Sequence, residues 1–436
     1  MPWRLLFGTS LIIAVVGASG YAYWTSSKEA NVAGAAASYQ TMEETNDVYV
    51  RFVMEAYDTV AKQYWQKAED KQLAELFTLS VQKAAATTTA AAVDRASTAK
   101  LVAAQFAPLK DDGAKRQLAT QLLQVALYNM APTGRNQLLT SQQQKEVQQT
   151  VQKVDPSSNL YSELGVTDSA TREEIQAAYA KKKAELAASS SPEAAKELER
   201  ISYVGDVLVD PTAKERYDTS KAEPTVFSRR FGSTLYIRLD RMAPTTAADI
   251  TTVLENASTS PLSSLIFDLR GNLGGALDQV PTMLGIFLGK NQYAFDIYHQ
   301  GDFTVVRSTV DKISQLDRYQ EIALLTDNMS QSSAEVFAAA IKRFNLGVLV
   351  GAPTRGWGSI EGTYPLTTKI DPDTDYALML VYGLTLREDN EPIEGKGVDP
   401  DIALSDSAWR SQLSGQLRSQ SLIEAIKQTA TAAPLQ

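Results

Sequence analysis

The sequence contains no cysteine and only one histidine, His299. The lack of cysteine excludes disulfide bonds, thiolate metal sites and cysteine nucleophiles. With one histidine, a multi-histidine metal centre is also excluded, and a Ser-His-Asp triad could use only His299, which lies in a polar, strand-like segment with no motif around it. We therefore expect neither a metal ion nor a cofactor.

An excess of basic charge is also missing, because 42 lysines and arginines against 51 aspartates and glutamates give a formal net charge of -9. Proteins that bind nucleic acid usually carry a basic excess on one face, so we expect no nucleic-acid partner. Hydrophobic residues make up 44% of the 436 residues, which is enough for a packed interior. A chain of this length predicts more than one domain.

A long apolar run occurs only near the N-terminus, from Leu5 to Trp24. It is nearly uncharged and about as long as a helix that crosses a bilayer. Arg4 precedes the run, so the positive-inside rule predicts a cytoplasmic N-terminus and an extracytoplasmic bulk, in a periplasm or at a cell surface. A cleaved signal peptide is the alternative, since residues 18–20 are small. Residues 1–26 are therefore predicted to be a transmembrane anchor or a signal.

The next region, residues 27–154, is predicted to be all-helical. Apolar residues recur at helical spacing in 48–60 and 73–79. Residues 84–93 are rich in alanine and threonine, which indicates a frayed helix or a loop. We interpret the region as a helical bundle or spacer between the membrane and the later domains.

Residues 155–222 resemble a J-domain of the DnaJ type. The resemblance rests on the Tyr-x-x-Leu-Gly-Val start at 161–166, the helix with Glu-Glu-Ile and Tyr at 172–179, and the closing Asp-Pro and Tyr-Asp within 208–218. J-domains act on DnaK-type chaperones through His-Pro-Asp between their long helices, and the corresponding loop 188–193 has no histidine. We therefore expect a degenerate J-like domain with a structural or docking role and no chaperone partner.

The pattern changes to alternating strands and helices after about residue 223, which predicts an α/β core. The predicted strands are 235–239, 262–269, 322–326 and 348–351, and a helix is expected at about 333–344. This domain is expected to extend over 223–410, with a C-terminal helix and tail at 411–436.

Four segments of this domain belong together. They are Asp-Leu-Arg-Gly-Asn-Leu-Gly-Gly at 268–275, Ser-Gln-Ser-Ser-Ala-Glu at 330–335, the glycine-containing segment 351–361, and Pro-Ile-Glu-Gly-Lys-Gly-Val-Asp-Pro-Asp-Ile at 392–402. Their order and spacing resemble the C-terminal-processing (tail-specific) serine peptidases. The resemblance implies a ClpP/crotonase-like strand-helix core and a serine peptidase that acts on polypeptides. Many members carry a substrate-binding PDZ domain before this core, and here the J-like segment takes its place.

The resemblance assigns the nucleophile to Ser332, three residues before Glu335, and the oxyanion-hole donors to the backbone around Gly274 and to the N–H of Ser333. A serine at a helix start lies where the helix dipole favours negative charge, and glycines after a strand can expose N–H groups. Each residue also has a purely structural interpretation. Ser332 could be a helix N-cap, and Gly274 and Gly275 could form a turn with unusual backbone angles.

The family's general base is a buried lysine between two glycines, and that position corresponds to Trp357. An indole cannot accept a proton, whereas Glu361 stands where the family has a glutamine. Residues 357, 359 and 361 of a strand project to one side, so Glu361 could face the serine, and a carboxylate with a raised pKa can act as a base. Arg355 is always protonated, and Lys342 falls toward the far end of the predicted helix.

Two functions stay open from the sequence, while a third, a chaperone-linked adaptor that works through the J-like segment, is disfavoured by the missing His-Pro-Asp. The first is a membrane-anchored, extracytoplasmic serine endopeptidase that cuts polypeptides with Ser332. The second is a non-catalytic pseudopeptidase that retains the cleft and binds or scaffolds polypeptides. Trp357 favours the second function, whereas the resemblance to the peptidase family favours the first.

Overall fold

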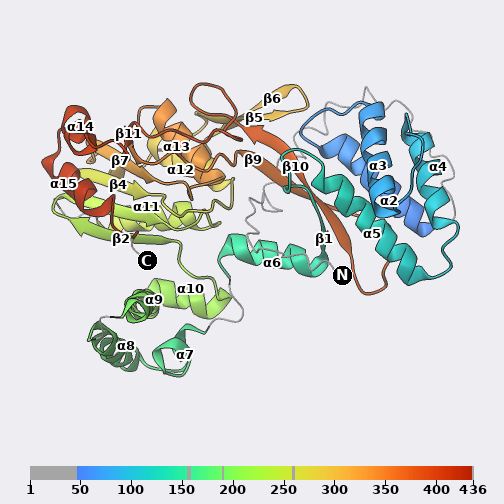
Figure 1. Ribbon diagram of the computed structural model, residues 1–436. Coiled ribbons are helices and arrows are strands. Elements are labelled where there is room, and N and C mark those ends of the chain that lie inside the picture. Colours follow the sequence, from blue (N-terminus) through green and yellow to red (C-terminus); the bar gives the residue numbers. More distant parts are fainter. Residues whose placement is uncertain (1–46, 155–158, 189–190, 258–260, 435–436) are drawn as a thin grey trace.

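The structure is a computed structural model that describes residues 47–154, 159–188, 191–257 and 261–434 (Figure 1). Within these residues, no helix combines the length and the apolar character needed to cross a bilayer. The predicted anchor or signal at 1–26 lies outside the described residues.

Four helices form the first part of the described chain, as the periodicity predicts. They are α2 (Val48–Gln63), α3 (Asp70–Ala84), α4 (Arg95–Phe106) and α5 (Asp112–Tyr128). Aspartates begin three of them because a carboxylate accepts the free N–H groups of a first turn; the Asp47 side chain, for example, accepts from Tyr49 N at 2.9 Å. The ambiguous segment after Ala84 contains no helix until Arg95 and is a loop.

These helices pack on a long hairpin that comes from the other end of the chain. The hairpin consists of β9 (Ser359–Pro365) and β10 (Tyr376–Thr385), and β1 (Gln137–Thr140) pairs antiparallel with β10. Leu378 and Leu380 of β10 belong to the same buried cluster as Phe52 of α2. Figure 1 shows the hairpin reaching between the two halves of the molecule. The helical region therefore packs on the hairpin whose first strand, β9, begins two residues after Trp357.

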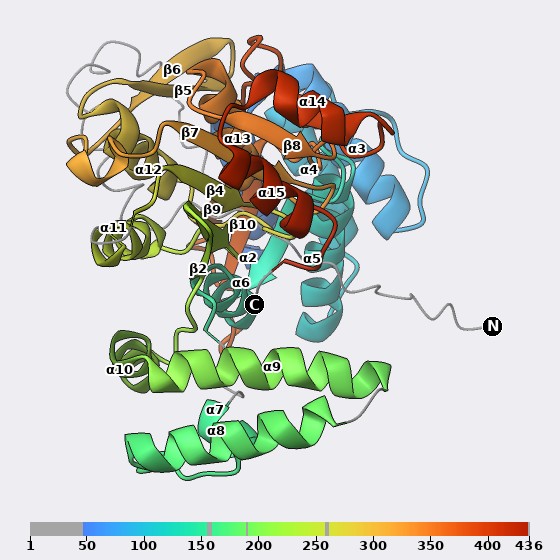
Figure 2. The same ribbon diagram turned by 90° about the vertical axis from the view of Figure 1, so that its left-hand side faces the viewer.

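The segment with J-like motifs is helical throughout and has a core of its own. After α6 (Ser141–Gln152) it contains α7 (Leu160–Leu164), α8 (Arg172–Ala187), α9 (Pro192–Val209) and α10 (Pro211–Ser220). The long helices α8 and α9 lie side by side, below the rest of the molecule in Figure 2. Tyr161, Ile175 and Val204 are buried together. This helical arrangement agrees with the predicted helices, and the J-like identity itself stays a prediction.

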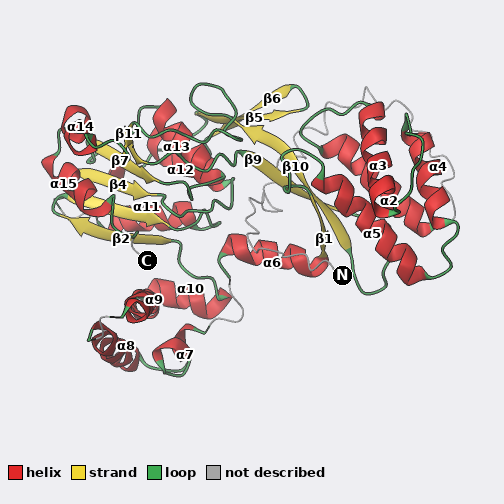
Figure 3. Cartoon of the chain, in the orientation of Figure 1, coloured by secondary structure: helices red, strands yellow, loops and turns green. Residues whose placement is uncertain are grey.

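A six-stranded sheet forms the centre of the last region (Figure 3). Its order is β11 (Ile402–Ala403), β8 (Val348–Gly351), β7 (Glu321–Thr326), β4 (Ser264–Asp268), β3 (Thr234–Leu239) and β2 (Val226–Phe231). All neighbours are parallel except β2 and β3, which form an antiparallel hairpin. The predicted strands in this region are confirmed within a few residues, and the parallel core is α/β as expected.

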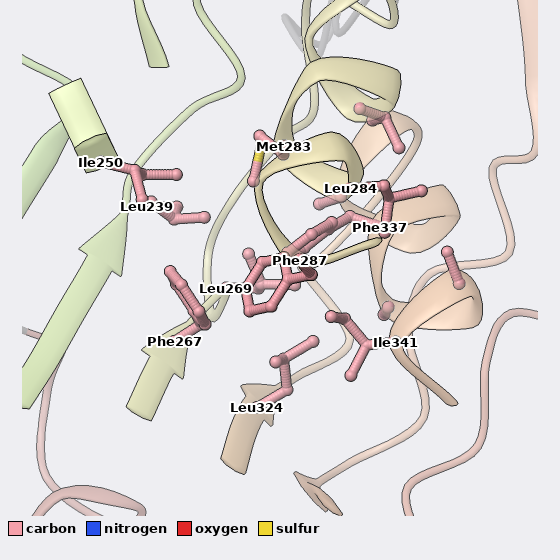
Figure 4. Packing of buried hydrophobic residues seen from close by; sticks show 14 of the residues in the cluster. Leu239, Ile250, Phe267, Leu269, Met283, Leu284, Phe287, Leu324, Phe337 and Ile341 are labelled. Atoms are coloured by element: carbon pink, nitrogen blue, oxygen red, sulfur yellow. The ribbon is translucent and has the colours of Figure 1, made fainter. Parts of the chain in front are cut away.

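Helices cover both faces of this sheet because its strands are apolar on both sides. One face carries α11 (Thr246–Asn256), α12 (Gln279–Leu288) and α13 (Ser333–Arg343). Figure 4 shows Phe267 and Leu324 of the sheet against Phe287 of α12 and Phe337 of α13. The other face carries α14 (Trp409–Gln416) and α15 (Gln420–Thr429).

A second, antiparallel sheet was not expected from the sequence. It joins β1 and β10 to β5 (Tyr293–His299) and β6 (Asp302–Arg307), and β9 pairs along β10. A single 3-10 turn, η1 (Ser314–Leu316), follows β6. His299 lies at the end of β5, where its ring stacks on Tyr382 and its Nδ1 is 2.6 Å from the Tyr382 carbonyl oxygen. These contacts give the only histidine a structural place in the sheet.

Candidate functional site

The four sequence segments meet at the start of α13. The Ser330 hydroxyl donates to the Leu269 carbonyl at 2.8 Å, and Gln331 N donates to the Asn272 carbonyl at 2.9 Å. The third segment joins at Arg355, whose N–H donates to the Ser330 carbonyl at 2.9 Å. The fourth lies behind the third, because Gly395 N donates to the carbonyl of Gly356 at 2.9 Å. The structure thus brings together all the segments that the sequence singled out.

Ser332 is held in an unusual backbone conformation directly before α13. Its φ is 58° and its ψ is -126°, a region that residues with a side chain rarely adopt. Strain of this kind persists only where the surroundings impose it, and it is common at functional sites. The side chain is largely buried, with 7% of the residue exposed. Ser332 is the N-cap of α13 and forms a capping box with Glu335, as the structural interpretation predicts, but its positive φ departs from the extended backbone of an ordinary N-cap.

Gly274 lies against Ser332 so closely that no side chain could replace it. A Cβ built on Gly274 would be 2.6 Å from the Ser332 Cβ and 3.1 Å from its Oγ. The φ of Gly274 is 82°, and that of Gly275 is 137°, which also favours glycine. The Asn272 side chain fixes this turn, because it donates to the Leu239 carbonyl and accepts from Gly274 N, both at 2.8 Å.

The N–H groups predicted to stabilise an oxyanion differ in whether they already donate a hydrogen bond. The Gly274 N–H is engaged by Asn272, as described above. Among the described residues, the N–H groups of Gly275 and Ser333 donate no hydrogen bond. Ser333 is the first residue of α13, where an N–H has no acceptor within the helix and the helix dipole favours an anion. Around Ser332 and the glycine turn, the N–H groups without an acceptor among the described residues are therefore those of Ser333, which was predicted, and of Gly275, whereas the Gly274 N–H is engaged.

Glu335 connects the serine to the segment that carries Trp357. Its carboxylate accepts four hydrogen bonds: Ser332 N at 2.8 Å, Thr354 Oγ1 at 2.5 Å, Gly356 N at 2.7 Å and Trp357 N at 2.7 Å. Burial raises the pKa of Glu335, while the four hydrogen bonds lower it. Because Ser332 N and Trp357 N share the same oxygen, Oε2, the two residues are neighbours. Trp357 thus lies beside the nucleophile position, where the resemblance places the base.

The indole of Trp357 is covered by arginine side chains. The guanidinium carbon of Arg135 lies 4.0 Å from the ring centroid, and that of Arg355 lies 4.9 Å from it. Arg135 comes from the loop between α5 and β1, in the helical region. Such contacts attract a cation to the electron-rich face of the ring.

Arg135 also contacts the two other residues that project from the same side of the strand. Its Nη1 donates to Ser359 Oγ at 2.6 Å and lies 3.5 Å from Glu361 Oε1, and its Nη2 lies 3.3 Å from Glu394. Trp357, Ser359 and Glu361 thus contact the same arginine, although β9 begins only at Ser359. Nothing in the local sequence around Arg135 indicated this role, since its partners are more than two hundred positions away.

The Glu361 carboxylate is buried and engaged by neighbours other than Ser332. Ser359 Oγ donates to Glu361 Oε1 at 2.7 Å, and Arg135 completes the ion pair. Burial raises the pKa of Glu361 to about 7, against the lowering effect of Arg135. Among the described residues, no hydrogen bond joins Glu361 to Ser332.

Lys342 has a structural role. Lys342 Nζ donates to the Asp399 carbonyl and pairs with Glu388 and Asp401, at the far end of α13 as predicted.

The charged pair of the segment 268–275 also has a structural role. Asp268 and Arg270 form a buried ion pair at 2.5 Å. The remaining donors of Arg270 hold the carbonyls of Ala430 and Ala432 after α15, both at 2.8 Å. In the described parts of the chain, no group of side chains could hold a metal ion.

One family model matches a part of this chain. Residues 233–404 match the model of peptidase family S41. The predicted likeness to the C-terminal-processing serine peptidases is thereby confirmed for this part of the chain, which we call the S41 region.

Curated relatives match over the same part. A "Probable CtpA-like serine protease" of Staphylococcus aureus (strain N315) is 24% identical over 184 residues, which cover 42% of this chain and 36% of that protein. A protein of the same name from Staphylococcus haemolyticus (strain JCSC1435) is 27% identical over 173 residues, or 40% of this chain and 34% of that protein. The chain thus spans about a third of the length of these relatives.

Solved structures resemble a larger share of the chain at lower identity. A photosystem II D1 C-terminal processing protease has a TM-score of 0.47 and 13% identity, and covers 83% of this chain and 94% of its own. A lipoprotein from Streptococcus agalactiae has a TM-score of 0.44 and 13% identity, and covers 86% of this chain and 98% of its own. Neither score reaches 0.5, so no function is transferred from these structures.

Proposed function

We propose that the chain is a serine peptidase of the S41 type that cuts polypeptides with Ser332 as the nucleophile. The observation that carries the proposal is the constrained serine at the start of α13, packed on the glycine turn with open N–H groups beside it. Attack of the Ser332 oxygen on a peptide carbonyl would place negative charge on the carbonyl oxygen. The N–H groups of Ser333 and Gly275 are available to stabilise that oxyanion, and the α13 dipole adds to their effect.

Glu361 is the base that we propose for the proton of Ser332. A pKa of about 7 leaves a substantial fraction of this carboxylate ionised near neutral pH, as a general base requires. The carboxylate faces Arg135 and Ser359 rather than Ser332. Proton transfer therefore requires a rearrangement of this cluster or a bridging water molecule.

The membrane anchor and the extracytoplasmic location are part of the same proposal. They rest on the apolar run from Leu5 to Trp24, outside the described residues. In cells that express the full chain, we expect the protein to fractionate with membranes and to be degraded by protease added from outside the cytoplasm. A cleaved signal would instead yield a shortened, membrane-free chain.

The test of the activity is cleavage of an unstructured polypeptide, such as casein, by the purified full chain. Ser332→Ala should reduce the rate by roughly a thousandfold or more if Ser332 is the nucleophile. Glu361→Gln should cause a comparable loss if Glu361 is the base. Thermal unfolding of Ser332→Ala, recorded beside wild type, controls for changes in the fold.

A second pair of variants separates the peptidase from the pseudopeptidase. Trp357→Lys alone would place an ammonium beside Arg135, so the informative variant is Trp357→Lys combined with Arg135→Gln, with Arg135→Gln alone as its control. If only the double variant cleaves, and does so through Ser332, the natural chain is a pseudopeptidase. If wild type cleaves and Ser332→Ala does not, the proposal stands.

A further inference from the structure

Strand β6 is an edge of the antiparallel sheet that lacks the usual protection of a sheet edge. It comes last in the strand order, and Figures 1 and 2 both show it on the outside of the β5–β6 hairpin. Exposed edges of native sheets commonly carry charged residues or proline, which prevent pairing with another chain. The edge strand β2 fits this rule because it contains the exposed Arg229 and Arg230. In β6, residues 303–306 are uncharged and include no proline.

The unpaired peptide groups of this edge belong to alternate residues of β6. In an antiparallel ladder, every second residue turns its N–H and C=O groups toward the same neighbouring strand. Ser308 directly follows β6. Its N–H donates to the Gln292 carbonyl at 2.8 Å, and its carbonyl accepts from Asn291 N at 2.9 Å. By this alternation, β5 engages the even-numbered residues of β6. The peptide groups that face the open edge are those of Phe303, Val305 and Arg307.

The same three residues form the exposed face of β6, because side chains alternate along a strand. Phe303 is 60% exposed and Val305 is 47% exposed, so this strand carries two of the five large apolar side chains that are exposed in the described chain. The Phe303 ring lies 5.2 Å from that of Tyr298, which in turn lies 6.2 Å from that of Trp65. Single exposed apolar residues are common, but this aromatic row ends at open peptide groups. The edge thus combines an apolar face with free hydrogen-bond donors and acceptors.

The sequence of β6 is complementary to itself about a two-fold axis at Val305. Such an axis, perpendicular to the sheet, pairs two copies of one edge strand antiparallel and keeps each face of the sheet continuous. Val305 then lies opposite its own copy, and Phe303 lies opposite Arg307 on both sides of the axis. All three pairs join residues whose peptide groups face the edge, so hydrogen bonds form in both directions. Each Arg307 guanidinium lies beside a Phe303 ring, which attracts a cation to its face.

Arg307 is available for this contact. Its Nη1 donates to the Asn291 carbonyl at 3.2 Å, and among the described residues it forms no ion pair. A register centred on Thr304 would instead place Arg307 opposite Gly301 of the hairpin turn and leave its charge unused. An unrelated extended polypeptide would meet the same peptide groups without the repeated aromatic–arginine contact. The chemistry of β6 therefore favours the first register and a second copy of the chain.

We propose that two copies of this chain form a dimer through β6, paired antiparallel about a two-fold axis at Val305. The two antiparallel sheets then continue into one another, and the exposed apolar face of each edge packs beside that of the other copy. This inference is independent of the proposed peptidase activity, since it involves none of the residues assigned to the reaction.

Cysteine cross-linking tests the pairing and its register in the purified full chain, because the natural sequence contains no cysteine. The two Cα atoms of a hydrogen-bonded antiparallel pair are about 5.5 Å apart, which is within the range of a disulfide. Val305→Cys should therefore give a disulfide-linked dimer under mild oxidation. Phe303→Cys and Arg307→Cys should each stay unlinked alone and should link to each other when co-expressed. Val93→Cys, at an exposed loop position, measures links from chance collisions.

We expect Val305→Cys to cross-link at least about tenfold faster than Val93→Cys, since pairing holds the two thiols at a high effective concentration. Sedimentation velocity gives an independent measurement without cysteines. Wild type should sediment as a dimer and Val305→Lys as a monomer, because two ammonium groups would lie opposite each other across the axis. Val93→Lys should leave the dimer intact, and thermal unfolding of both lysine variants controls for changes in the fold.

Equal cross-linking of Val305→Cys and Val93→Cys would overturn the inference, as would a monomeric wild type or a dimer that persists in Val305→Lys. A link from Phe303→Cys to Val305→Cys, in place of the link to Arg307→Cys, would move the axis to Thr304 and overturn the register. If wild type is monomeric and Val305→Lys binds casein or lipid vesicles more weakly, the edge docks another polypeptide or a membrane, and the dimer is refuted.

Discussion

The two sides of the proposed active site are built in different ways. On the serine side, Ser332 and the glycine turn at 274–275 have the conformation and the open N–H groups that acyl transfer needs. On the base side, Trp357 occupies the expected lysine position, and Arg135 of the helical region covers it and pairs with Glu361. The backbone geometry at the proposed nucleophile and the identity of the proposed base are thus separable features of this region.

Glu335 explains why the two sides stay together. It holds the serine side through Ser332 N and the base side through Thr354, Gly356 and Trp357. A changed residue at 357 therefore leaves the backbone of the serine side in place, because the hydrogen bonds involve main-chain atoms of Gly356 and Trp357.

The largest effect is expected from Glu335→Leu, which breaks both sides at once. Loss of the carboxylate leaves three buried N–H groups and one hydroxyl without an acceptor, at about 1–3 kcal/mol for each unsatisfied group. We expect the free energy of unfolding to fall by at least about 4 kcal/mol in urea denaturation. Glu255→Leu, at an exposed position of α11, is the control, and an equal effect of both variants would contradict the role of Glu335.

Arg135→Met should break only the base side. It leaves the buried carboxylate of Glu361 and the half-buried carboxylate of Glu394 without their shared cation, and opening a buried ion pair usually costs about 4 kcal/mol. Combination with Glu361→Gln should recover part of that loss, as a double-mutant cycle would measure. Additive effects of the two changes would show that Arg135 and Glu361 are not coupled.

Glu361 should make stability depend on pH. Burial raises its pKa from 4.5 to about 7, so the folded chain holds a proton that the unfolded chain releases between these values. The free energy of unfolding should therefore fall as the pH rises from about 4.5 to about 7, by up to about 3 kcal/mol from this group. Glu361→Gln should flatten the profile, with a residual slope of the same sign from Glu335 and Glu394, whose pKa values burial also raises. An unchanged profile would contradict the burial of the Glu361 charge.

The smallest effect is expected from Trp357→Leu, which removes the aromatic face under Arg135 and Arg355 while the main-chain hydrogen bonds remain. The loss should be about 1 kcal/mol, the usual size of a cation–π contact. Trp357→Phe should lose less, because it retains an aromatic ring. Equal thermal stability of all three proteins would show that the stacking does not stabilise the base side.

The serine side was largely predictable from the sequence, whereas the base side was not. Ser332, Ser333 and the glycine turn are specified by segments that follow parallel strands, and such strands bring their ends to one edge of the sheet. The Asn272 side chain accepts from the nearby Gly274 N–H. The sequence alone did not show which N–H group this side chain would engage. Arg135 reaches the site only because β10 inserts into the helical region, a long-range packing that local patterns do not specify.

Because local patterns do not specify long-range packing, the second sheet was not predicted from the sequence either. Its strands are joined across long sequence separations, from β1 to β10 and from β10 to β5, and β5 and β6 are half-exposed rather than apolar. Periodicity detects the buried parallel strands more readily, because their apolar runs are continuous.

The most direct test of the account is labelling of the full chain with a serine-reactive phosphonate, followed by mass spectrometry of the modified peptide. We expect the Ser332 hydroxyl to be reactive, so wild type should form an adduct at Ser332. The double variant Trp357→Lys with Arg135→Gln should react faster, and Ser332→Ala should form none. An adduct at another serine, or no adduct at Ser332 in either wild type or the double variant, would contradict the central claim.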